Sequence, residues 1–338
     1  MHNRQTFFTL HRLQNELHSN FVTSKTSPVW RGCNGCDGPG TFGPGYGCSI
    51  QLERHDPGGH AGARRICAMP FAVQHWVSFT QRGCTGFGLL NGSQIAVHTG
   101  NLFDSPTATG EQLALADVQI GLPCQPGKFI GLWNNYHAQA TRQNLAIPLE
   151  PLYFIKAASS YCPHAHAVVS PESYVGRVVY EGELGLVIGK SCKNANTDEA
   201  LAAIFGVTCV NDVTALDLIS RDTSFAQWTR AKSFDTFGAF GPVIATGLDL
   251  NALTVKTLVN GRERQNYPCS DMIFSPAQIV AALSKEMTLL PGDLIACGTS
   301  LGVLPMKPGT VVEVVIDGIG TLCNTFMPGT TESNAGRN

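Results

Sequence analysis

Two glutamates stand two residues apart inside an apolar stretch, and this feature constrains the fold of the chain more than any other. Glu181 and Glu183 lie between Val178-Val179 and Leu186-Val187-Ile188. The flanking residues predict a buried strand, in which residues two apart project from the same face, roughly 6.5–7 Å apart. Carboxylates inside such a strand are costly unless they are paired or bind a metal. They also repel each other unless a positive charge lies between them.

A third acid follows a neighbouring apolar run. Asp212 stands at the end of the run 205–210, after Asn211, where it would converge with the two glutamates on one ion. Carboxylate oxygens select a hard cation such as Mg²⁺, Ca²⁺ or Mn²⁺ over zinc. Two alternatives stay open. The glutamates would be solvated acids on an exposed strand edge, or Asp212 would cap a helix, a task that Asp217 would share.

Lys232 is a further candidate for chemistry. It lies in Arg230-Ala-Lys-Ser-Phe-Asp235, within a stretch rich in Phe and Gly. A lysine there would stabilise a developing enolate or carboxylate. The alternative is a surface lysine, which is the more common fate of this residue.

Composition indicates a folded protein with a buried core. Of 338 residues, 43% are hydrophobic and 14% are charged, with a formal net charge of −2. Nucleic-acid binding needs a basic surface, and no run reaches the apolar length of a membrane-spanning helix. The N-terminus lacks the apolar core and cleavage site of a secretory signal. We therefore expect a cytoplasmic protein whose twelve cysteines are reduced and mostly buried.

The first 68 residues differ in composition from the rest. Residues 31–65 are dominated by Gly and Pro, so we expect residues 1–68 to be mostly disordered, with Met69 as a candidate natural start. Pro and Gly at 123–127 punctuate the remaining sequence. The pattern therefore predicts a small N-terminal β domain over 69–125, a second domain over 126–328 and a tail over 329–338.

The hydrophobic pattern predicts an α+β protein that is mainly β, with few short helices and no regular βαβ repeat. Asn91-Gly92 and Asn260-Gly261 each separate two strand-like segments, which predicts β-hairpins with two-residue turns. Ser275-Pro276 is expected to begin a helix through Glu286, and Thr197 to cap a helix through Ile204. The other predicted strands cover residues 177–180, 184–188, 205–210, 255–259, 262–267, 294–297 and 311–316.

Several segments, in the same order along the chain, resemble the fumarylacetoacetate hydrolase family. They are Glu181-Gly-Glu183-Leu-Gly-Leu-Val-Ile-Gly-Lys190, Asn211-Asp212-Val-Thr-Ala-Leu-Asp217, Ala231-Lys-Ser-Phe-Asp235, Ser270-Asp-Met-Ile-Phe-Ser275, Leu290-Pro-Gly-Asp-Leu-Ile295 and Cys297-Gly-Thr299. The resemblance covers roughly residues 127–326, and residues 76–117 look like the small N-terminal domain of many members. It implies a mixed β-roll fold with short helices, usually in a homodimer.

The resemblance also implies a set of site residues. It maps the Mg²⁺ ligands, with Mn²⁺ or Ca²⁺ as alternatives, onto Glu181, Glu183 and Asp212. It maps the active-site lysine onto Lys232, and a contact to the substrate carboxylate onto Thr299.

Two positions depart from the family pattern. Many members carry a His–Glu pair that activates water; the segment 131–140 retains His137 but has Ala140 where the glutamate is expected. A histidine without its carboxylate is a weaker and less firmly oriented base. Leu216 replaces the arginine of the pattern Asp-x-Thr-x-Arg-Asp, which removes a bidentate grip on a substrate carboxylate.

The resemblance implies an Mg²⁺-dependent enzyme of small 2-oxo acid catabolism, including that of aromatic compounds, which hydrolyses a C–C bond in an acylpyruvate-type substrate. In the working hypothesis the cation is a Lewis acid, Lys232 stabilises an enolate and His137 transfers a proton. The first alternative is an isomerase, decarboxylase or sugar-acid dehydratase of the same family, which needs no strong water activation and is favoured by Ala140. The second is a non-catalytic protein that binds a 2-oxo acid.

Overall fold

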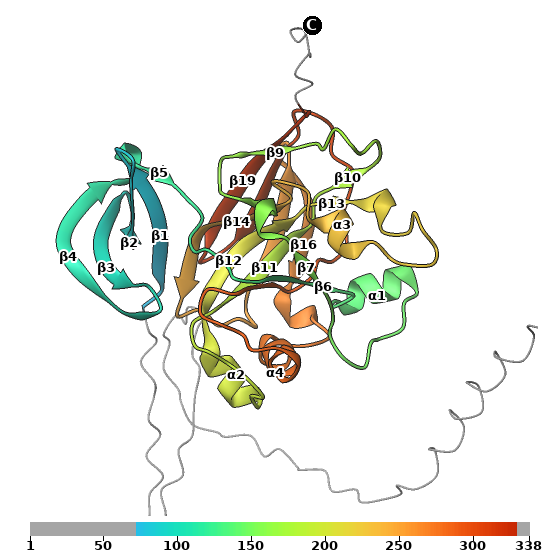
Figure 1. Ribbon diagram of the computed structural model, residues 1–338, viewed down its shortest axis with the longest axis horizontal. Coiled ribbons are helices and arrows are strands. Elements are labelled where there is room, and N and C mark those ends of the chain that lie inside the picture. The colour runs from blue at the N-terminus through green and yellow to red at the C-terminus, as the bar shows by residue number, and fades with distance from the viewer. Residues whose placement is uncertain (1–71, 330–338) are drawn as a thin grey trace, which may run out of the picture. The chain divides into compact units, whose positions relative to one another are not determined.

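The structure, a computed structural model, describes residues 72–329 (Figure 1). The expectations for residues 1–68, for a start at Met69 and for most of the tail concern residues outside this range.

The largest sheet has twelve strands. They are β1 (Gln74–Gln81), β2 (Cys84–Asn91), β3 (Gln94–Asn101), β4 (Asp104–Ala114), β5 (Gln119–Ile120), β6 (Phe129–Trp133), β7 (Leu152–Lys156), β8 (Tyr161–Cys162), β11 (Gly182–Ile188), β12 (Ile204–Asp212), β14 (Gly238–Thr246) and β17 (Leu294–Ala296). The strand order is β4-β3-β2-β1-β14-β12-β11-β17-β6-β7, while β5 pairs with β1 and β8 pairs with β14. The segment that contains both glutamates therefore lies near the middle of the sheet.

Two smaller sheets complete the strand arrangement. A five-stranded sheet has the order β16-β15-β18-β19-β9, and β10 pairs with β13 in a two-stranded sheet. Their strands are β9 (Ala167–Val169), β10 (Val178–Val179), β13 (Thr214–Ala215), β15 (Thr254–Val259), β16 (Arg262–Pro268), β18 (Val311–Ile316) and β19 (Gly320–Met327).

Helices are few and short in the described part of the chain, which together with the three sheets confirms the predicted mainly β fold class. The α-helices are α1 (His137–Gln143), α2 (Thr197–Ala203), α3 (Trp228–Lys232) and α4 (Pro276–Glu286). Helix α4 begins where predicted, because Ser275 and Gln278 form a capping box. The cap of α2 is Asn196, one residue before the predicted Thr197, since its side chain accepts hydrogen bonds from two backbone N–H groups.

The first four strands form an antiparallel meander that continues the large sheet through pairing of β1 with β14. The hairpin of β2 and β3 confirms the prediction, but the turn is displaced by one residue. Asn91 pairs with Gln94, so Gly92-Ser93 forms the loop, with Gly92 at a φ of 60°. The second hairpin turns at Asn260-Gly261 as predicted, because Val259 pairs with Arg262.

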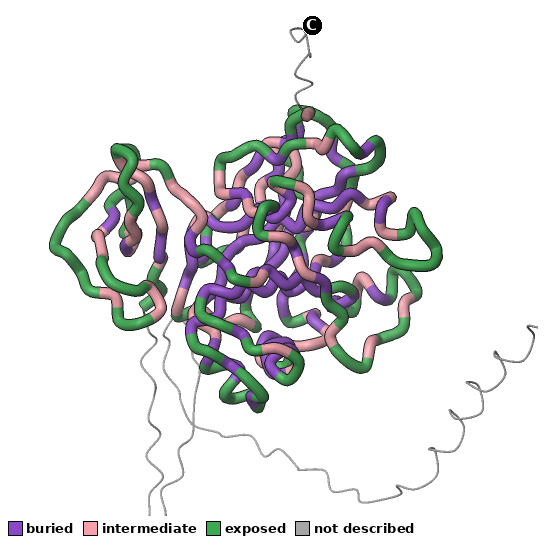
Figure 2. The backbone as a smooth tube through the Cα atoms, in the orientation of Figure 1, coloured by how far each residue is buried: buried purple, intermediate pink, exposed green. Residues whose placement is uncertain are grey.

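Burial differs sharply between the meander and the rest of the described chain (Figure 2). All residues of β4 are exposed or half-buried, whereas all seven residues of β11 are buried. Strand β19, which was not predicted, alternates buried and half-buried residues along most of its length. The central strands therefore supply most of the core, and any polar group on them must find a partner or a ligand.

Candidate metal centre

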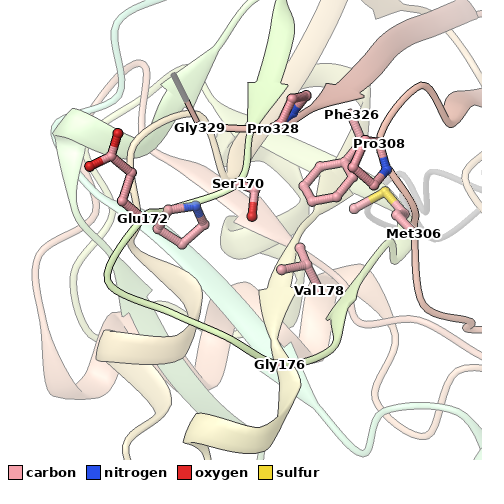
Figure 3. Close-up of a pocket in the computed structure, with 10 residues that line it drawn as sticks. Ser170, Glu172, Gly176, Val178, Met306, Pro308, Phe326, Pro328 and Gly329 are labelled. Carbon is pink, nitrogen blue, oxygen red and sulfur yellow. The ribbon is translucent and has the colours of Figure 1, made fainter. Parts of the chain in front are cut away.

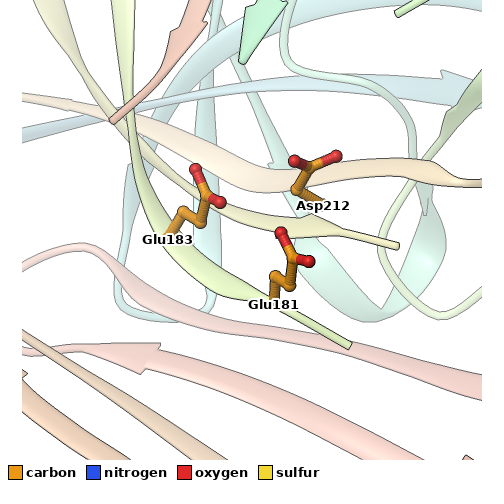
Figure 4. Close-up of side chains that lie close together, drawn as sticks. All are labelled: Glu181, Glu183 and Asp212. Carbon is orange, nitrogen blue, oxygen red and sulfur yellow. The ribbon is translucent and has the colours of Figure 1, made fainter. Parts of the chain in front are cut away.

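The three acids predicted as ligands come together at the adjacent ends of β11 and β12. The strands are antiparallel, with Glu183 opposite Val210, and the Asp212 N–H donates to the Glu181 carbonyl at 2.8 Å. Ligand oxygens of Glu181, Glu183 and Asp212 all lie within 4.8 Å of one another, and the carboxylates face a common point (Figure 4). We call these three residues the carboxylate cluster.

The cluster is buried, which makes its charges costly. Glu183 and Asp212 are 0% exposed, and the Glu181 side chain is 14% exposed. Burial and the neighbouring charges of Asp212 and Glu181 hold the pKa of Glu183 well above its ordinary value. Burial also raises the pKa of Glu181, against the opposing effect of Lys232. The alternative of two solvated acids on a strand edge is therefore wrong.

Two buried lysines balance this negative charge. Lys232 Nζ lies 2.6 Å from Glu181 Oε2 and 2.5 Å from Asp212 Oδ2, so it is not a surface lysine. Lys156 Nζ, at the end of β7, lies 2.5 Å from Asp212 Oδ1. Burial alone would raise the pKa of Asp212, but the two ammonium groups lower it below its ordinary value. Sequence reasoning missed Lys156.

The residues of the cluster fit a divalent cation. Their ligand atoms are all oxygens, the set that Mg²⁺, Mn²⁺ and Ca²⁺ prefer. Glu183 Oε2 accepts the Gly298 N–H at 2.7 Å, but Glu183 Oε1 is buried and has no hydrogen-bond partner within residues 72–329. A buried carboxylate oxygen without a partner is expensive, and a bound cation would satisfy it.

The ammonium group of Lys232 lies over one aromatic ring, which belongs to a packed group of three. Its Nζ lies 4.7 Å from the centroid of the Phe154 ring, and Trp228 stacks on Phe154 with a centroid distance of 5.7 Å and an angle of 11°. Trp133 packs on Trp228 at 5.5 Å. A cation over an aromatic face is attracted by the ring quadrupole, so the Phe154 ring helps to retain the charge of Lys232 beside the cluster.

Thr299, predicted to contact substrate, is hydrogen-bonded within the protein. Its Oγ1 donates to the Gly182 carbonyl at 3.0 Å and accepts from Gln265 Nε2 at 2.8 Å. Gly182 is the residue between the two glutamates, so Thr299 lies next to the cluster. Its contact with substrate stays a prediction.

His137 occupies the first position of α1 and is exposed. Its ring takes part in no hydrogen bond or ion pair with another described residue, and α1 contains no acid in its sequence His-Ala-Gln-Ala-Thr-Arg-Gln. The position where the glutamate was expected, Ala140, is fully buried. The structure therefore shows no histidine–carboxylate pair on this helix.

The spacing of the family pattern leads to the same result in a second register. The family segment that carries the His–Glu pair commonly has the pattern Asn-Tyr-x-x-His-x-x-Glu. Counted from Asn135-Tyr136 without a gap, this pattern puts Gln139 at the histidine position and Arg142 at the glutamate position. Counted back from His137, the glutamate position is Ala140. Neither register gives α1 a carboxylate.

Leu216 and Asp217 lie beyond the cluster along the same segment. Leu216 is half-buried and offers only methyl groups where the family pattern has a guanidinium. Asp217 pairs with Arg177, whose Nη2 lies 2.5 Å from Asp217 Oδ1, so it serves neither as a helix cap nor as a partner of the cluster.

A separate pocket of ≈ 330 Å³ lies at the ends of β10 and β19 and is lined by residues including Val178, Met306, Pro308 and Phe326 (Figure 3). None of the three acids lines it. The pocket is therefore separate from the carboxylate cluster.

The eight cysteines in the described part of the chain are all free, and most of them are buried, as predicted. Within residues 72–329, no helix combines the length and the apolar character needed to cross a membrane.

Two family models match this chain. The model of the fumarylacetoacetate hydrolase C-terminal domain matches residues 128–327, which include the cluster and both lysines. The model of the Rv2993c-like N-terminal domain matches residues 74–123, which form the meander and β5.

Similar proteins include an uncharacterized protein of Archaeoglobus fulgidus, 43% identical over 216 residues, which are 64% of this chain and 85% of that protein. Oxaloacetate tautomerase YisK of Bacillus subtilis is 35% identical over 255 residues, covering 70% of this chain and 84% of that protein. The crystal structure of 2-hydroxyhepta-2,4-diene-1,7-dioate isomerase from Mycobacterium marinum superposes with a TM-score of 0.70 at 33% identity, over 75% of this chain and 99% of that chain.

Proposed function

This chain belongs to the fumarylacetoacetate hydrolase family, and from that premise we propose that it is a metal-dependent enzyme of proton transfer on a small 2-oxo acid. The proposed reaction is keto–enol tautomerisation or isomerisation of a conjugated double bond. The observation that carries this proposal is the difference between an intact carboxylate cluster and a helix α1 without any acid. Relatives named as a tautomerase and an isomerase support it.

The carboxylate cluster would hold the cation, which when bound supplies a Lewis acid for the keto and carboxylate oxygens of the substrate. Lys232 places a positive charge next to Glu181 and Asp212 and would stabilise the enolate oxygen. Its Nζ is also our candidate for carrying the proton. Lys156, buried against Asp212, keeps that carboxylate ionised and oriented.

The proposed reaction needs no activated water. An enol loses the proton of its hydroxyl group while its C3 atom gains one, so the mass of the substrate does not change. Hydrolysis of a C–C bond requires a water deprotonated by a general base, and α1 offers no histidine–carboxylate pair for this step. The same difference disfavours the predicted acylpyruvate hydrolysis.

Hydrolysis of an acylpyruvate remains the second candidate function. Exposure of His137 at the start of α1 favours it, because an exposed imidazole has access to water. We expect this activity to be much the slower of the two, since an unpaired histidine is poorly oriented.

A substrate panel tests the proposal. Enolic oxaloacetate, dienoic diacids and acylpyruvates are incubated with protein and Mg²⁺, then with EDTA, against the same buffers without protein. We expect chelator-sensitive conversion of an enol or a diene to a product of unchanged mass, and little pyruvate from acylpyruvates. Fast, chelator-sensitive cleavage of an acylpyruvate without enol conversion would establish the hydrolase instead.

A further inference from the structure

The backbone between the two glutamates is fixed by two side chains from the five-stranded sheet and by Thr299. The Gly182 N–H donates to Gln265 Oε1 at 3.0 Å. The Gly182 carbonyl accepts from Thr299 Oγ1 at 3.0 Å and from the Tyr267 hydroxyl. Gln265 and Tyr267 both belong to β16. We call Gln265, Tyr267 and Thr299 the Gly182 clamp.

Gln265 uses both ends of its amide in this arrangement. While Oε1 accepts from Gly182, Nε2 donates to Thr299 Oγ1 at 2.8 Å and to the Ser300 carbonyl at 3.2 Å. Its side chain is 1% exposed. A glutamine amide can accept from the Gly182 N–H and at the same time donate to the Ser300 carbonyl. A carboxylate or an alkyl group at this position would leave at least one of these buried backbone groups without a partner.

A local irregularity of the sheet lies next to Gln265. Thr257 pairs with Gln265, but the next residue, Leu258, pairs with Glu263, so Arg264 is an extra residue in β16. Such a bulge redirects the neighbouring side chain. The position also requires glycine at 182, because a Cβ atom there would lie 2.0 Å from Thr257 Oγ1.

We propose that Gln265 is a positioning residue for the metal centre: through Gly182 it sets the spacing and direction of the Glu181 and Glu183 carboxylates. This inference rests on the proposed function, because it assumes that the cluster binds a cation. The clamp touches no ligand atom of the cluster directly. It acts on the peptide units that carry two of the three ligands, so its loss should weaken cation binding in protein that remains folded.

Asn324 provides a matched control for a purely structural role. It lies in β19 of the same five-stranded sheet, is 2% exposed, and donates to the carbonyls of Pro163 and His166 at 2.9 and 2.8 Å. Asn324→Leu therefore removes a buried amide with backbone partners, as Gln265→Met does, but on another part of the sheet. If both amides only stabilise the fold, both variants lose stability and neither changes cation affinity.

The test is titration of metal-free protein with Mn²⁺, with free Mn²⁺ followed by electron paramagnetic resonance. We expect Gln265→Met to bind Mn²⁺ about 10- to 100-fold more weakly than wild type, the range seen when partners of metal ligands are removed. Asn324→Leu should bind as wild type does. Equal affinity of folded Gln265→Met and wild type would overturn the positioning role.

A second variant keeps the inference testable if Gln265→Met fails to fold. Tyr267→Phe removes one of the two hydroxyl donors to the Gly182 carbonyl, and we expect it to weaken Mn²⁺ binding about fivefold, as for one lost hydrogen bond. Unchanged Mn²⁺ affinity in Tyr267→Phe would contradict the clamp. Failure of wild type to bind Mn²⁺ at all would instead reject the metal centre and with it the proposed function.

Discussion

The carboxylate cluster and helix α1 differ in the charged side chains that they carry. The cluster packs three acids against the buried amines of Lys156 and Lys232. Helix α1 carries no acid, and its histidine, His137, is exposed without a carboxylate partner. A buried set of charges is costly and persists only where it is balanced or bound. The contrast supports the proposed proton transfer over hydrolysis, because helix α1 offers no histidine–carboxylate pair.

Among the variants considered, removal of a cluster ligand should have the largest effect on turnover. Glu183→Gln keeps the shape of the side chain but removes its charge, so we expect turnover in Mg²⁺ to fall about 1000-fold, since a Lewis acid contributes several kcal/mol. Because the charge of Glu183 is buried, the variant should be at least as stable as wild type without metal. Steady-state rates and thermal melts with Mg²⁺ and EDTA check both points.

The exposed Glu111→Gln in the meander is the matched control for that variant, and it should leave rate and melting temperature unchanged. Wild-type turnover in Glu183→Gln would remove the cluster from the mechanism.

Loss of Lys156 tests the charge balance. Lys156→Met leaves Asp212 with Lys232 as its remaining partner, and breaking a buried pair from one side costs about 3 kcal/mol. We expect urea unfolding to show a loss of this size. Lys128→Met, which removes a lysine that is 26% exposed and paired with Asp293, should cost less. If Lys156→Met is as stable as wild type, Lys232 alone balances the charge of Asp212.

Introducing a histidine and an acid into α1 at the positions of the family pattern should give this helix the histidine–carboxylate pair that it lacks. Gln139→His with Arg142→Glu fills both pattern positions at sites that are half-buried and exposed, so the helix should tolerate them. We expect acylpyruvate hydrolysis to rise about tenfold, a fraction of what a well-placed general base contributes. Arg142→Glu alone should give no gain. Unchanged hydrolysis in the folded double variant would mean that α1 does not limit this reaction.

The smallest effect concerns the surface ion pair of Arg177 and Asp217. Hydrogen bonds from Arg177 lower the pKa of Asp217 to about 2, so the pair stabilises the fold above the ordinary carboxyl pKa and loses this contribution as the pH falls towards 2. The side chains of Arg177 and Asp217 are 60% and 37% exposed, so solvent screens the pair and we expect Asp217→Asn to cost about 0.5 kcal/mol at pH 7. Urea unfolding of both proteins at pH 7 and pH 3 should show the difference shrinking at the lower pH. A difference independent of pH would exclude the ion pair as its cause.

The sequence alone predicted the cluster because its members lie on strands with a clear apolar pattern. Glu181 and Glu183 are two residues apart, and Asp212 ends the neighbouring strand, so local periodicity placed them on adjacent strands. It left the alternatives of solvated acids and a helix cap open, and the resemblance to the family mapped the three acids as ligands. Lys156 escaped prediction because its contact with Asp212 joins residues 56 positions apart. Gln265 was not predicted for the same reason. In addition, the bulge beside it interrupts the alternation of strand residues, so the sequence pattern gives no clear signal for the direction of its side chain.

The fold class was predictable, and so were about half of the strands. Other strands were not predicted, including β6, β7, β14 and β19, and some predicted boundaries were displaced. The first hairpin turn shifted by one residue to Gly92-Ser93, because pairing of Asn91 with Gln94 depends on the partner strand. The order of strands in the large sheet depends on long-range pairing that no local pattern reports. The homodimer and the division at residues 125 and 126 stay predictions.

The most direct test of the account follows one sample by proton NMR in D₂O, with an acylpyruvate, protein and Mg²⁺. Deuterium entering at C3 reports proton transfer, and pyruvate reports hydrolysis. Above the rates without protein, we predict rapid exchange at C3 that EDTA abolishes, with little or no pyruvate over the same time. Release of pyruvate as fast as exchange would contradict the account and identify the chain as a hydrolase.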